Sequence, residues 1–346
     1  MSSSKRPRIV DVARLAGVSE GTVSVVLNNR VGENVRVSKQ TQQKIWDVVR
    51  ELGYVANPVA QSLAGGQNRI IAIFTFESIF PIDSRSFYYP FLIGIEEEAD
   101  IQGYDLLLVT GSIGSENGAR RIYQNGVNRL QRADGAILLG HGDRTEVERL
   151  LQDDFPFVFV GRRDSKHDQI SYVSADYTTA TLEVMQYLRQ NGHVKTAYVR
   201  STRDTEASAE RETGVRKGLE QPSAQDWLWR TTPADITAEK ITTYLNKGFT
   251  AFVVEDDELG HRLLNVSQSC GLQCPDDFSL AVLGNPLNPM IDVPEWTSFN
   301  IPRREMGHEA FNLLLERLQH AHGDNVFPLR KQLTCTFNAG KTVRRV

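Results

Sequence analysis

The sequence predicts two kinds of structure in one chain, a small all-α head followed by a larger α/β body with parallel sheets. Two short amphipathic runs lie close together near the N-terminus, which is typical of a small helical domain. From Ile70 onward, buried-strand patterns alternate with amphipathic runs. A chain of 346 residues is also too long for one hydrophobic core. We therefore expect a head and a body of more than one lobe.

The head begins with "IVDVARLA" and "SEGTVSVVLNNR", two helical patterns joined by "GV". Ser19 is a suitable N-cap for the second helix. Val23, Val26 and Leu27 fall on one stripe of that helix, so they are expected to be buried. Two helices joined by a glycine-containing turn predict a helix-turn-helix, whose second helix reads DNA. This helix is unusual for that role, because no Lys or Arg lies between Ser19 and Asn29.

A third helix and a short fourth one follow in the sequence. In "VSKQTQQKIWDVVRELGY", Ser38 is the expected N-cap and Gly53 the residue that ends the helix. Its apolar stripe consists of Ile45, Val48, Val49 and Leu52. In "NPVAQSLAGG", Pro58 suits the first turn of a helix that two glycines end after about two turns. Because so short a helix is marginally stable alone, we expect it to become ordered only with a partner.

The body shows eight strand patterns: "IIAIFTF", "YDLLLVTG", "DGAILLG", "FPFVFVG", "ISYVSAD", "TAYVRS", "TAFVVED" and "SLAVLGN". Amphipathic runs lie between them, among them "FLIGIEEEADIQG", "NGARRIYQNGVNRLQ", "YTTATLEVMQYLRQNG", "AEKITTYLNKG" and "REMGHEAFNLLLERLQ". Near-continuous apolar strands predict parallel sheets that are covered on both faces. Eight units exceed one ordinary sheet, and a break after "GRRDSKHDQ" predicts two lobes. Ligands of such folds bind outside the carboxyl ends of the strands, here between the lobes.

Composition and charge narrow the function classes. Residues 1–68 carry nine Lys/Arg and five Asp/Glu, a net charge of +4, whereas the remainder carries −8. A basic head on an acidic body fits a nucleic-acid module fused to another function, although a solvated surface has the same charge. Three cysteines at these spacings favour reduced thiols, without a disulfide framework or a zinc site. Without a signal peptide or an apolar run long enough to span a membrane, we expect a cytoplasmic protein.

The chain resembles the LacI/GalR (lactose-repressor) family of bacterial transcription regulators over nearly its whole length. The matching segments are "VDVARLAGVSEGTVSVVLN", "RVSKQTQQKIWDVVRELGYVANP", "VAQSLAG", "GIEEEADIQGYDLLL", "DGAILLG", "FPFVFVGRR" and "PDDFSLAVLGN". The resemblance implies a helix-turn-helix head at 1–56, a hinge helix and linker at 57–68, and a periplasmic-binding-protein-like body at 69–346. We place lobe 1 at about 69–168 plus 303–325, and lobe 2 at about 169–302 plus 326–346.

The resemblance also implies a homodimer that places two heads on a pseudo-palindromic operator in double-stranded DNA. The family's base readers map onto Glu20, Gly21 and Val25. Members commonly have Arg or Lys at the last position, so the usual guanine contact is absent here. Glu20 can accept from a cytosine amino group, or it serves only to stabilise the helix N-terminus. Ser19, Thr22 and Ser24 are expected to contact phosphates through hydroxyls and backbone N–H groups. Further phosphate candidates are Arg8, Asn28, Asn29, Arg30 and Lys39, and the alternative for each of these five is a solvated surface position.

The hinge is the second expected DNA-binding element. At helical spacing Val59, Ala60 and Leu63 fall close to one edge. The resemblance implies that paired hinge helices enter the minor groove and that Leu63 wedges between base pairs, which kinks the duplex. The alternative is that Leu63 packs onto the body.

The body is expected to bind a small effector, a sugar or a related polar metabolite. Phe87 and Tyr88 match the family's effector-lining aromatic pair, and Arg211 matches its ligand-binding arginine, which suits hydroxyls or a carboxylate. Asp143 follows a strand and is placed to bond ligand hydroxyls. The remaining candidates are Trp229, Asp256 and Asn285. Because the position of Asn285 is usually Asp in sugar-binding members, the class of effector stays open.

Other function classes fit less well. A solute-binding receptor would explain the body but would need a signal peptide. "GHGDRT" departs from a dinucleotide fingerprint at Thr145. The seven histidines lack metal-ligand spacing, and no nucleophile–base pair can be assigned. We therefore expect no catalytic residue, no bound metal, no cofactor and no membrane partner.

Overall fold

The computed structural model describes residues 7–27, 36–54, 68–77, 87–111, 120–142, 144–164, 169–219, 225–285, 295–320 and 328–346. The chain forms two compact units. The first comprises Met1–Ile70 with Arg132–Asp134, and the second comprises Ile71–Gln131 with Gly135–Val346. The described part contains no helix long and apolar enough to cross a membrane.

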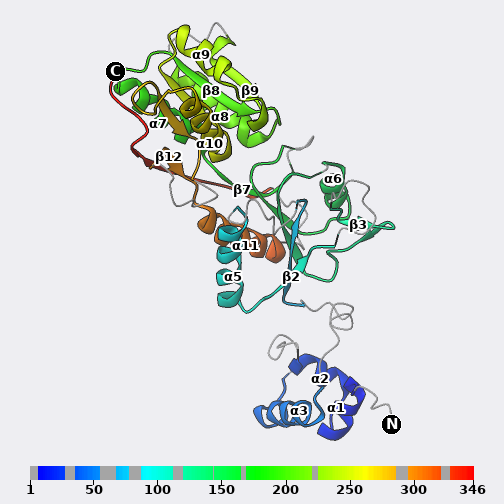
Figure 1. Cartoon of the computed structure of the whole chain (residues 1–346). Coiled ribbons are helices and arrows are strands. Elements are labelled where there is room, and N and C mark those ends of the chain that lie inside the picture. The colour runs from blue at the N-terminus through cyan, green and yellow to red at the C-terminus, as the bar shows by residue number, and fades with distance from the viewer. Residues whose placement is uncertain are drawn as a thin grey trace. The chain divides into compact units, whose positions relative to one another are not determined.

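The head consists of α1 (Ile9–Ala16), α2 (Glu20–Leu27) and α3 (Lys39–Leu52), drawn in blue in Figure 1. Gly17 ends α1 in the left-handed conformation at φ 71°, which a glycine adopts without strain. The helices enclose a small core of Val12, Ala13, Ala16, Val23, Val26, Ile45 and Val48. The predicted helix-turn-helix is thereby confirmed. Of the predicted apolar stripes, Val23, Val26, Ile45 and Val48 are buried, whereas Leu27, Val49 and Leu52 are half-buried against this core.

The first sheet of the body has the strand order β13-β7-β6-β5-β1-β2. Its strands are β1 (Ile70–Thr75), β2 (Asp105–Val109), β5 (Gly135–Leu139), β6 (Phe157–Val160), β7 (Tyr172–Ala175) and β13 (Arg330–Leu333). β1 pairs in parallel with β5, β5 with β6, β6 with β7, and β7 with β13. β5 and β6 are buried along their whole length, as strands of a sheet covered on both faces must be.

The second sheet has the order β14-β12-β11-β10-β8-β9. Its strands are β8 (Thr196–Ser201), β9 (Leu228–Thr231), β10 (Ala251–Val254), β11 (Ser279–Val282), β12 (Thr297–Asn300) and β14 (Thr336–Asn338). All the pairs are parallel except β12 with β14 at one edge. The predicted two-lobed body with parallel sheets is confirmed, with one antiparallel edge strand added.

Helices cover each sheet. In the first lobe α5 (Tyr89–Gln102) packs against α11 (Arg303–His320), and α6 (Arg144–Gln152) follows β5. Gly94 and Gly307 allow this close packing, because a Cβ on either would lie 2.0 or 2.3 Å from a backbone oxygen of the facing helix. In the second lobe α7 (Tyr177–Gln190) packs on α8 (Glu206–Gly218), and α9 (Ala238–Asn246) packs on α10 (Asp257–Ser269).

The predicted lobe boundaries are wrong at two strands. β7 and β13 lie within the ranges 169–302 and 326–346 that we assigned to lobe 2, yet both pair into the first sheet. The chain therefore passes between lobes at Asp176, at Ile301–Pro302 and at 334–335 in the described residues. The reason is that pairing between strands, including that of β7 with the distant edge strand β13, decides which sheet a strand joins, and local sequence patterns do not report it.

The amphipathic run "NGARRIYQNGVNRLQ" is not the expected helix. Its described part forms a hairpin of β3 (Tyr123–Gln124) and β4 (Val127–Asn128). The turn residues Asn125 and Gly126 both have positive φ, at 51° and 81°. Asn-Gly is the favoured pair for such a two-residue hairpin turn, so the local turn chemistry overrides the helical spacing.

Candidate nucleic-acid interface and effector site

The first candidate site is the N-terminal end of α2 in the head. Ser19 caps this helix, since its Oγ accepts from the Thr22 N–H at 3.1 Å and lies 2.9 Å from the Thr22 Oγ1. Ser19, Glu20 and Gly21 are all exposed. An exposed helix N-terminus attracts anions, because its partial positive charge and its N–H groups point outward. The arrangement can therefore bind a phosphate without a Lys or Arg on the helix.

The other face of α2 attaches it to the head. Val23 and Val26 are buried among the side chains of α1 and α3, whereas Ser24 and Val25 are half-buried. Val25 thus keeps part of its side chain accessible on the face opposite the core. A valine there can make an apolar contact, such as one with a thymine methyl group, but no hydrogen bond to a base.

Seven predicted site residues lie outside the described residues. They are Asn28, Asn29, Arg30, Val59, Ala60 and Leu63 in the DNA-binding set, and Asp143 in the effector set.

The second candidate site begins at the carboxyl end of β1 in the first lobe. Glu77 accepts a hydrogen bond from the Tyr88 hydroxyl at 2.7 Å and pairs with Arg203 of the second lobe at 3.1 Å. Burial and the neighbouring Glu77 carboxylate raise the pKa of Tyr88 well above its usual value, so this hydroxyl stays a donor. Of the predicted aromatic pair, Tyr88 is therefore buried and bonded, while Phe87 is half-buried.

More ion pairs join the two lobes nearby. Arg163, which follows β6, pairs with Glu206 at the start of α8 at 3.1 Å. Arg162 pairs with Glu210 at 3.1 Å, and Arg144 approaches Glu206 to 3.5 Å. Arg163 is largely buried and also donates to the Gly140 carbonyl at 2.6 Å, so this pair is screened less than the others. We call these three pairs and Arg203–Glu77 the interlobe pairs.

The structure brings Phe87, Arg211 and Asn285 into one region. Asn285 accepts from Arg303 at 2.7 Å, and the guanidinium of Arg303 lies 5.5 Å from the centre of the Phe87 ring. Arg211 donates to the carbonyl of Leu283 at 3.2 Å, two residues before Asn285. The predicted residues are thus linked through Arg303, which sequence reasoning missed.

Arg211 and Arg303 both rest on aromatic rings. The Arg211 guanidinium lies 4.2 Å from the centre of the Tyr177 ring, and Arg303 faces Phe87. Such stacking holds a guanidinium plane in place and leaves its edge free to donate hydrogen bonds. Tyr177 follows the crossover at Asp176, and Arg303 follows the crossover at Ile301–Pro302. A strand-to-helix transition with an arginine at the first helical position is the only signal that the sequence offers for Arg303.

Trp229 and Asp256 occupy different surroundings. Trp229 is 5% exposed and stacks on Tyr244 of α9 at 5.4 Å, so it packs in the interior of its lobe. Asp256 caps α10 by accepting from the Leu259 N–H at 2.9 Å. Burial, with the neighbouring carboxylates, raises the pKa of Asp256 to about 6. Their assignment to an effector site stays a prediction.

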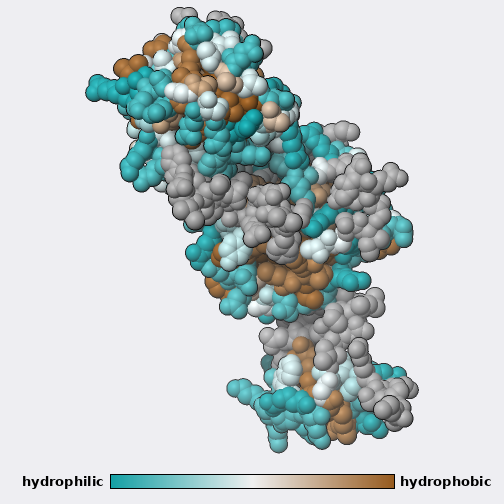
Figure 2. Space-filling view, viewed as in Figure 1, coloured by the Kyte–Doolittle hydropathy of each residue, from teal (hydrophilic) through white to brown (hydrophobic). Residues whose placement is uncertain are grey.

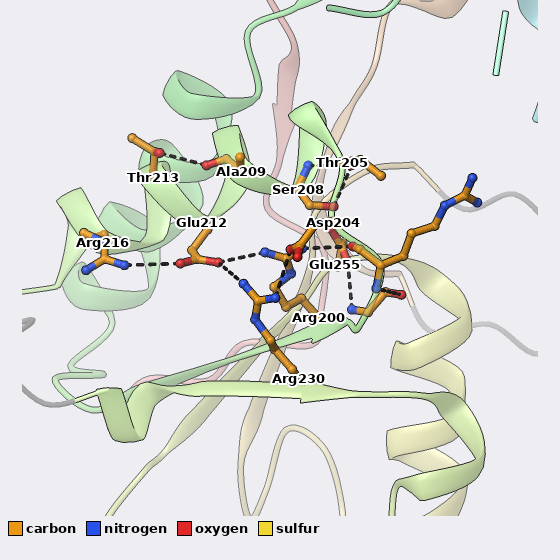
Figure 3. Close-up of polar contacts among 12 residues, drawn as sticks. Arg200, Asp204, Thr205, Ser208, Ala209, Glu212, Thr213, Arg216, Arg230 and Glu255 are labelled. Atoms are coloured by element: carbon orange, nitrogen blue, oxygen red, sulfur yellow. Dashed lines mark hydrogen bonds and ion pairs between the residues drawn. The ribbon is translucent and has the colours of Figure 1, made fainter. Parts of the chain in front are cut away.

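A charged cluster lies at the carboxyl ends of β8 and β9 (Figure 3). Arg200 is 2% exposed and donates to Glu212 and Asp204, each at 2.8 Å. Arg230 pairs with the same two carboxylates, at 3.6 and 2.9 Å. The cluster ties β8 and β9 to α8, the helix that carries Arg211.

Two family models match the chain. Residues 8–57 match the model described as bacterial regulatory proteins, lacI family. Residues 185–342 match that of a periplasmic binding protein-like domain. The first match covers the helix-turn-helix, and the second covers most of the second lobe together with α11.

Similar proteins extend over nearly the whole chain. The transcriptional repressor PurR of Vibrio parahaemolyticus is 30% identical over 338 residues, covering 94% of this chain and 96% of that protein. The transcriptional regulator CelR of Thermobifida fusca is 28% identical over 340 residues, or 95% and 96% of the two chains. A solved structure of a CelR–cellobiose complex has a TM-score of 0.63 at 26% identity, covering 97% of this chain and 100% of that one.

A helix-turn-helix head on a two-lobed α/β body defines a DNA-binding transcription regulator that responds to a small molecule. The chain belongs to the lacI family of bacterial regulatory proteins. The relatives named above are regulators and not enzymes, in line with the non-enzymatic function expected from the sequence.

Proposed function

We propose that the protein is a homodimeric repressor whose affinity for a pseudo-palindromic operator is switched by a small effector bound between its lobes. The observation that carries this proposal is the joining of a helix-turn-helix to a body whose lobes are linked by three crossovers and the interlobe pairs. Such a protein acts in the cytoplasm, at the nucleoid when bound to DNA. It needs no cofactor and catalyses no reaction.

Operator recognition is assigned to the exposed N-terminal end of α2. Hydroxyl and N–H groups at Ser19 and Thr22 contact phosphate, while Glu20 and Val25 contact bases as a cytosine acceptor and a thymine-methyl contact. Because neither residue can donate to guanine, the half-site differs there from that of relatives with Arg or Lys. Leu63, outside the described residues, is assigned the minor-groove wedge.

Effector binding is assigned to the region of Phe87, Arg211 and Asn285. Its place at the carboxyl ends of the strands, next to two crossovers, is where α/β folds bind ligands. A solved relative is a complex with cellobiose, which supports a sugar or a similarly polar metabolite here. An effector shifts the equilibrium between two arrangements of the lobes only by the difference in its affinity for them. By thermodynamic linkage, the same free-energy difference changes the affinity for the operator.

Dimerisation is assigned to the side of the first lobe that carries α5 and β2. Ile101 is 71% exposed, Tyr89 64% and Leu108 38%. Figure 2 shows a hydrophobic area where β2 lies. Exposed apolar side chains gathered on one part of a surface are typical of an interface, and a second copy would cover them symmetrically.

The test is a filter-binding assay with genomic DNA fragments at two salt concentrations. We expect specific binding that weakens at high salt, because phosphate contacts release counterions. Gly21→Asp, which places a carboxylate at the exposed end of α2 where a Cβ meets nothing closer than 3.7 Å, should lose binding at least about tenfold. Gln43→Glu on the exposed surface of α3 makes the same charge change and should keep binding. Salt-insensitive or absent binding of the unaltered protein would refute the regulator assignment.

A further inference from the structure

Two arginines beside the crossovers have no carboxylate partner within the described part of the chain. The described contacts of the Arg303 guanidinium are the Asn285 side-chain oxygen and the Phe87 ring. Those of Arg211 are the Leu283 carbonyl and the Tyr177 ring. Neither guanidinium has an acidic oxygen within 4.0 Å among the residues that the structure describes. Their positive charges are therefore balanced only by neutral groups and by more distant charges.

This arrangement is energetically costly, because Arg303 is only 6% exposed. Burial lowers the pKa of Arg303 below its usual value, and the positive charge of Arg211 lowers it further. A buried cation is normally compensated by an anion, since removal from water is expensive. Arg200, a similarly buried arginine of the second lobe, follows this rule and has both Glu212 and Asp204.

Two of the three carboxylates near the arginines are held by other groups. Glu210 is paired with Arg162, and Asp176 accepts from the Thr179 N–H at 2.9 Å as the cap of α7. The charge of Asp257 raises the pKa of Arg303, but the carboxylate lies outside ion-pair distance. None of the three is therefore placed to neutralise either arginine by direct contact.

We propose that the effector is a small organic anion, whose carboxylate or phosphate group is bound by Arg211 and Arg303 together. The inference rests on the proposed effector site and names the chemical class of its ligand. The planar guanidinium fork matches a carboxylate or phosphate with two parallel hydrogen bonds, and the Tyr177 and Phe87 rings hold the two planes.

An anion at this place would act directly on the lobe equilibrium. Arg303 begins α11, which packs on the first sheet, and it follows β12 of the second sheet by three residues. Arg211 belongs to the second lobe through α8. An anion shared by the two arginines would therefore favour the lobe arrangement that brings them closest.

The test uses the full-length protein and pairs of probes that differ by one anionic group. Glucuronate is compared with glucose for a carboxylate, and glucose 6-phosphate with glucose for a phosphate, by thermal shift and calorimetry at millimolar concentration. Inorganic phosphate and acetate, each against chloride at equal ionic strength, probe the anion site without a sugar. We expect at least one anion to bind at least about tenfold tighter than its neutral partner, with the affinity falling as salt rises.

Variants locate the effect. Arg211→Gln and Arg303→Gln should each abolish the preference for the charged probe. Arg216→Gln, also on α8 but exposed and paired with Glu212, should keep it. If circular dichroism shows that Arg303→Gln does not fold, Arg303→Lys replaces it as the test of the preference for the charged probe. This variant keeps the positive charge but loses the planar guanidinium that forms two parallel hydrogen bonds.

The outcomes separate this inference from the proposed function. Operator binding of the unliganded protein tests the regulator assignment alone. If the operator is bound but no anion binds better than its neutral partner, the anionic effector is refuted while the regulator stands. If the preference survives in Arg211→Gln, binding of the anion by Arg211 and Arg303 is refuted.

Discussion

At the scale of single residues, Arg200 and Arg211 of the second lobe illustrate two uses of the same side chain. Arg200 is enclosed by Glu212 and Asp204 and joins β8 to α8, as Figure 3 shows. Arg211, one turn along α8 from Ser208, points its guanidinium at a carbonyl and a ring. The first arrangement is self-sufficient and serves stability, whereas the second is incomplete without a ligand.

Replacing Arg200 with methionine should therefore destabilise the second lobe strongly. The change leaves Asp204 paired with Arg230, and Glu212 paired with Arg230 and Arg216, and we expect a loss of about 3 kcal/mol in the free energy of unfolding. Urea unfolding followed by the fluorescence of Trp227 and Trp229 measures it, since both lie in this lobe.

Arg216→Met is the matched control for that change. It removes a half-exposed i,i+4 partner of the same Glu212, and such surface pairs contribute about 0–1 kcal/mol. Equal losses in the two variants would contradict a structural role for the buried cluster.

At the scale of elements, α2 and α3 begin in the same way but serve different purposes. The hydroxyl of Ser19 caps α2 through Thr22, and that of Ser38 caps α3 through Thr41, with 3.1 Å between hydroxyl and N–H in both. The sequences "SEGT" and "SKQT" share this device. Of these two helices, only α2 is assigned to DNA contact. Removing either cap hydroxyl should cost the same amount of stability, so a difference in operator affinity between the two variants would report on DNA contact.

Ser19→Ala and Ser38→Ala should each lower the stability of the head by about 1 kcal/mol, the usual cost of losing an N-cap hydroxyl. Ser19→Ala should in addition weaken operator binding several-fold more than Ser38→Ala, because the proposed function assigns a phosphate contact to the N-terminus of α2. Thermal unfolding and gel-shift titrations at fixed salt measure the two effects. An equal loss of operator affinity in both variants would count against α2 as the DNA-contacting helix.

At the scale of the whole body, the crossovers and the interlobe pairs decide how the lobes can move. Three short segments connect the lobes, so a change in their relative arrangement bends few backbone positions. The interlobe pairs then add a bias toward the paired arrangement. Arg203–Glu77 is the most exposed of those that approach within 3.1 Å, so it can be altered with little risk to folding.

Arg203→Gln should leave stability almost unchanged, since a surface pair contributes about 0–1 kcal/mol, but it should shift the lobe equilibrium. We expect a change in the operator affinity of the unliganded protein of up to about fivefold, together with a changed scattering profile in solution. Arg230→Gln is the control, because Arg230 is similarly exposed and pairs only within the second lobe. The same change in both variants would show that Arg203 has no special role between the lobes.

Local sequence patterns determined much of this protein. The three head helices, both serine caps and the eight strands recognised by their apolar runs follow from spacing and capping, which involve residues only a few positions apart. The candidates Phe87, Arg211 and Asn285 came from the resemblance to a family, and their motifs are equally local.

The tertiary structure alone decided the rest. The membership of β7 and β13 in the first sheet, the short strands β9, β12 and β14, and the Asn125–Gly126 hairpin depend on pairing or on turns that periodicity does not report. The interlobe pairs and the position of Arg303 beside Phe87 likewise join residues far apart in the chain. Packing between distant segments sets these contacts, so local sequence patterns carry no direct signal for them.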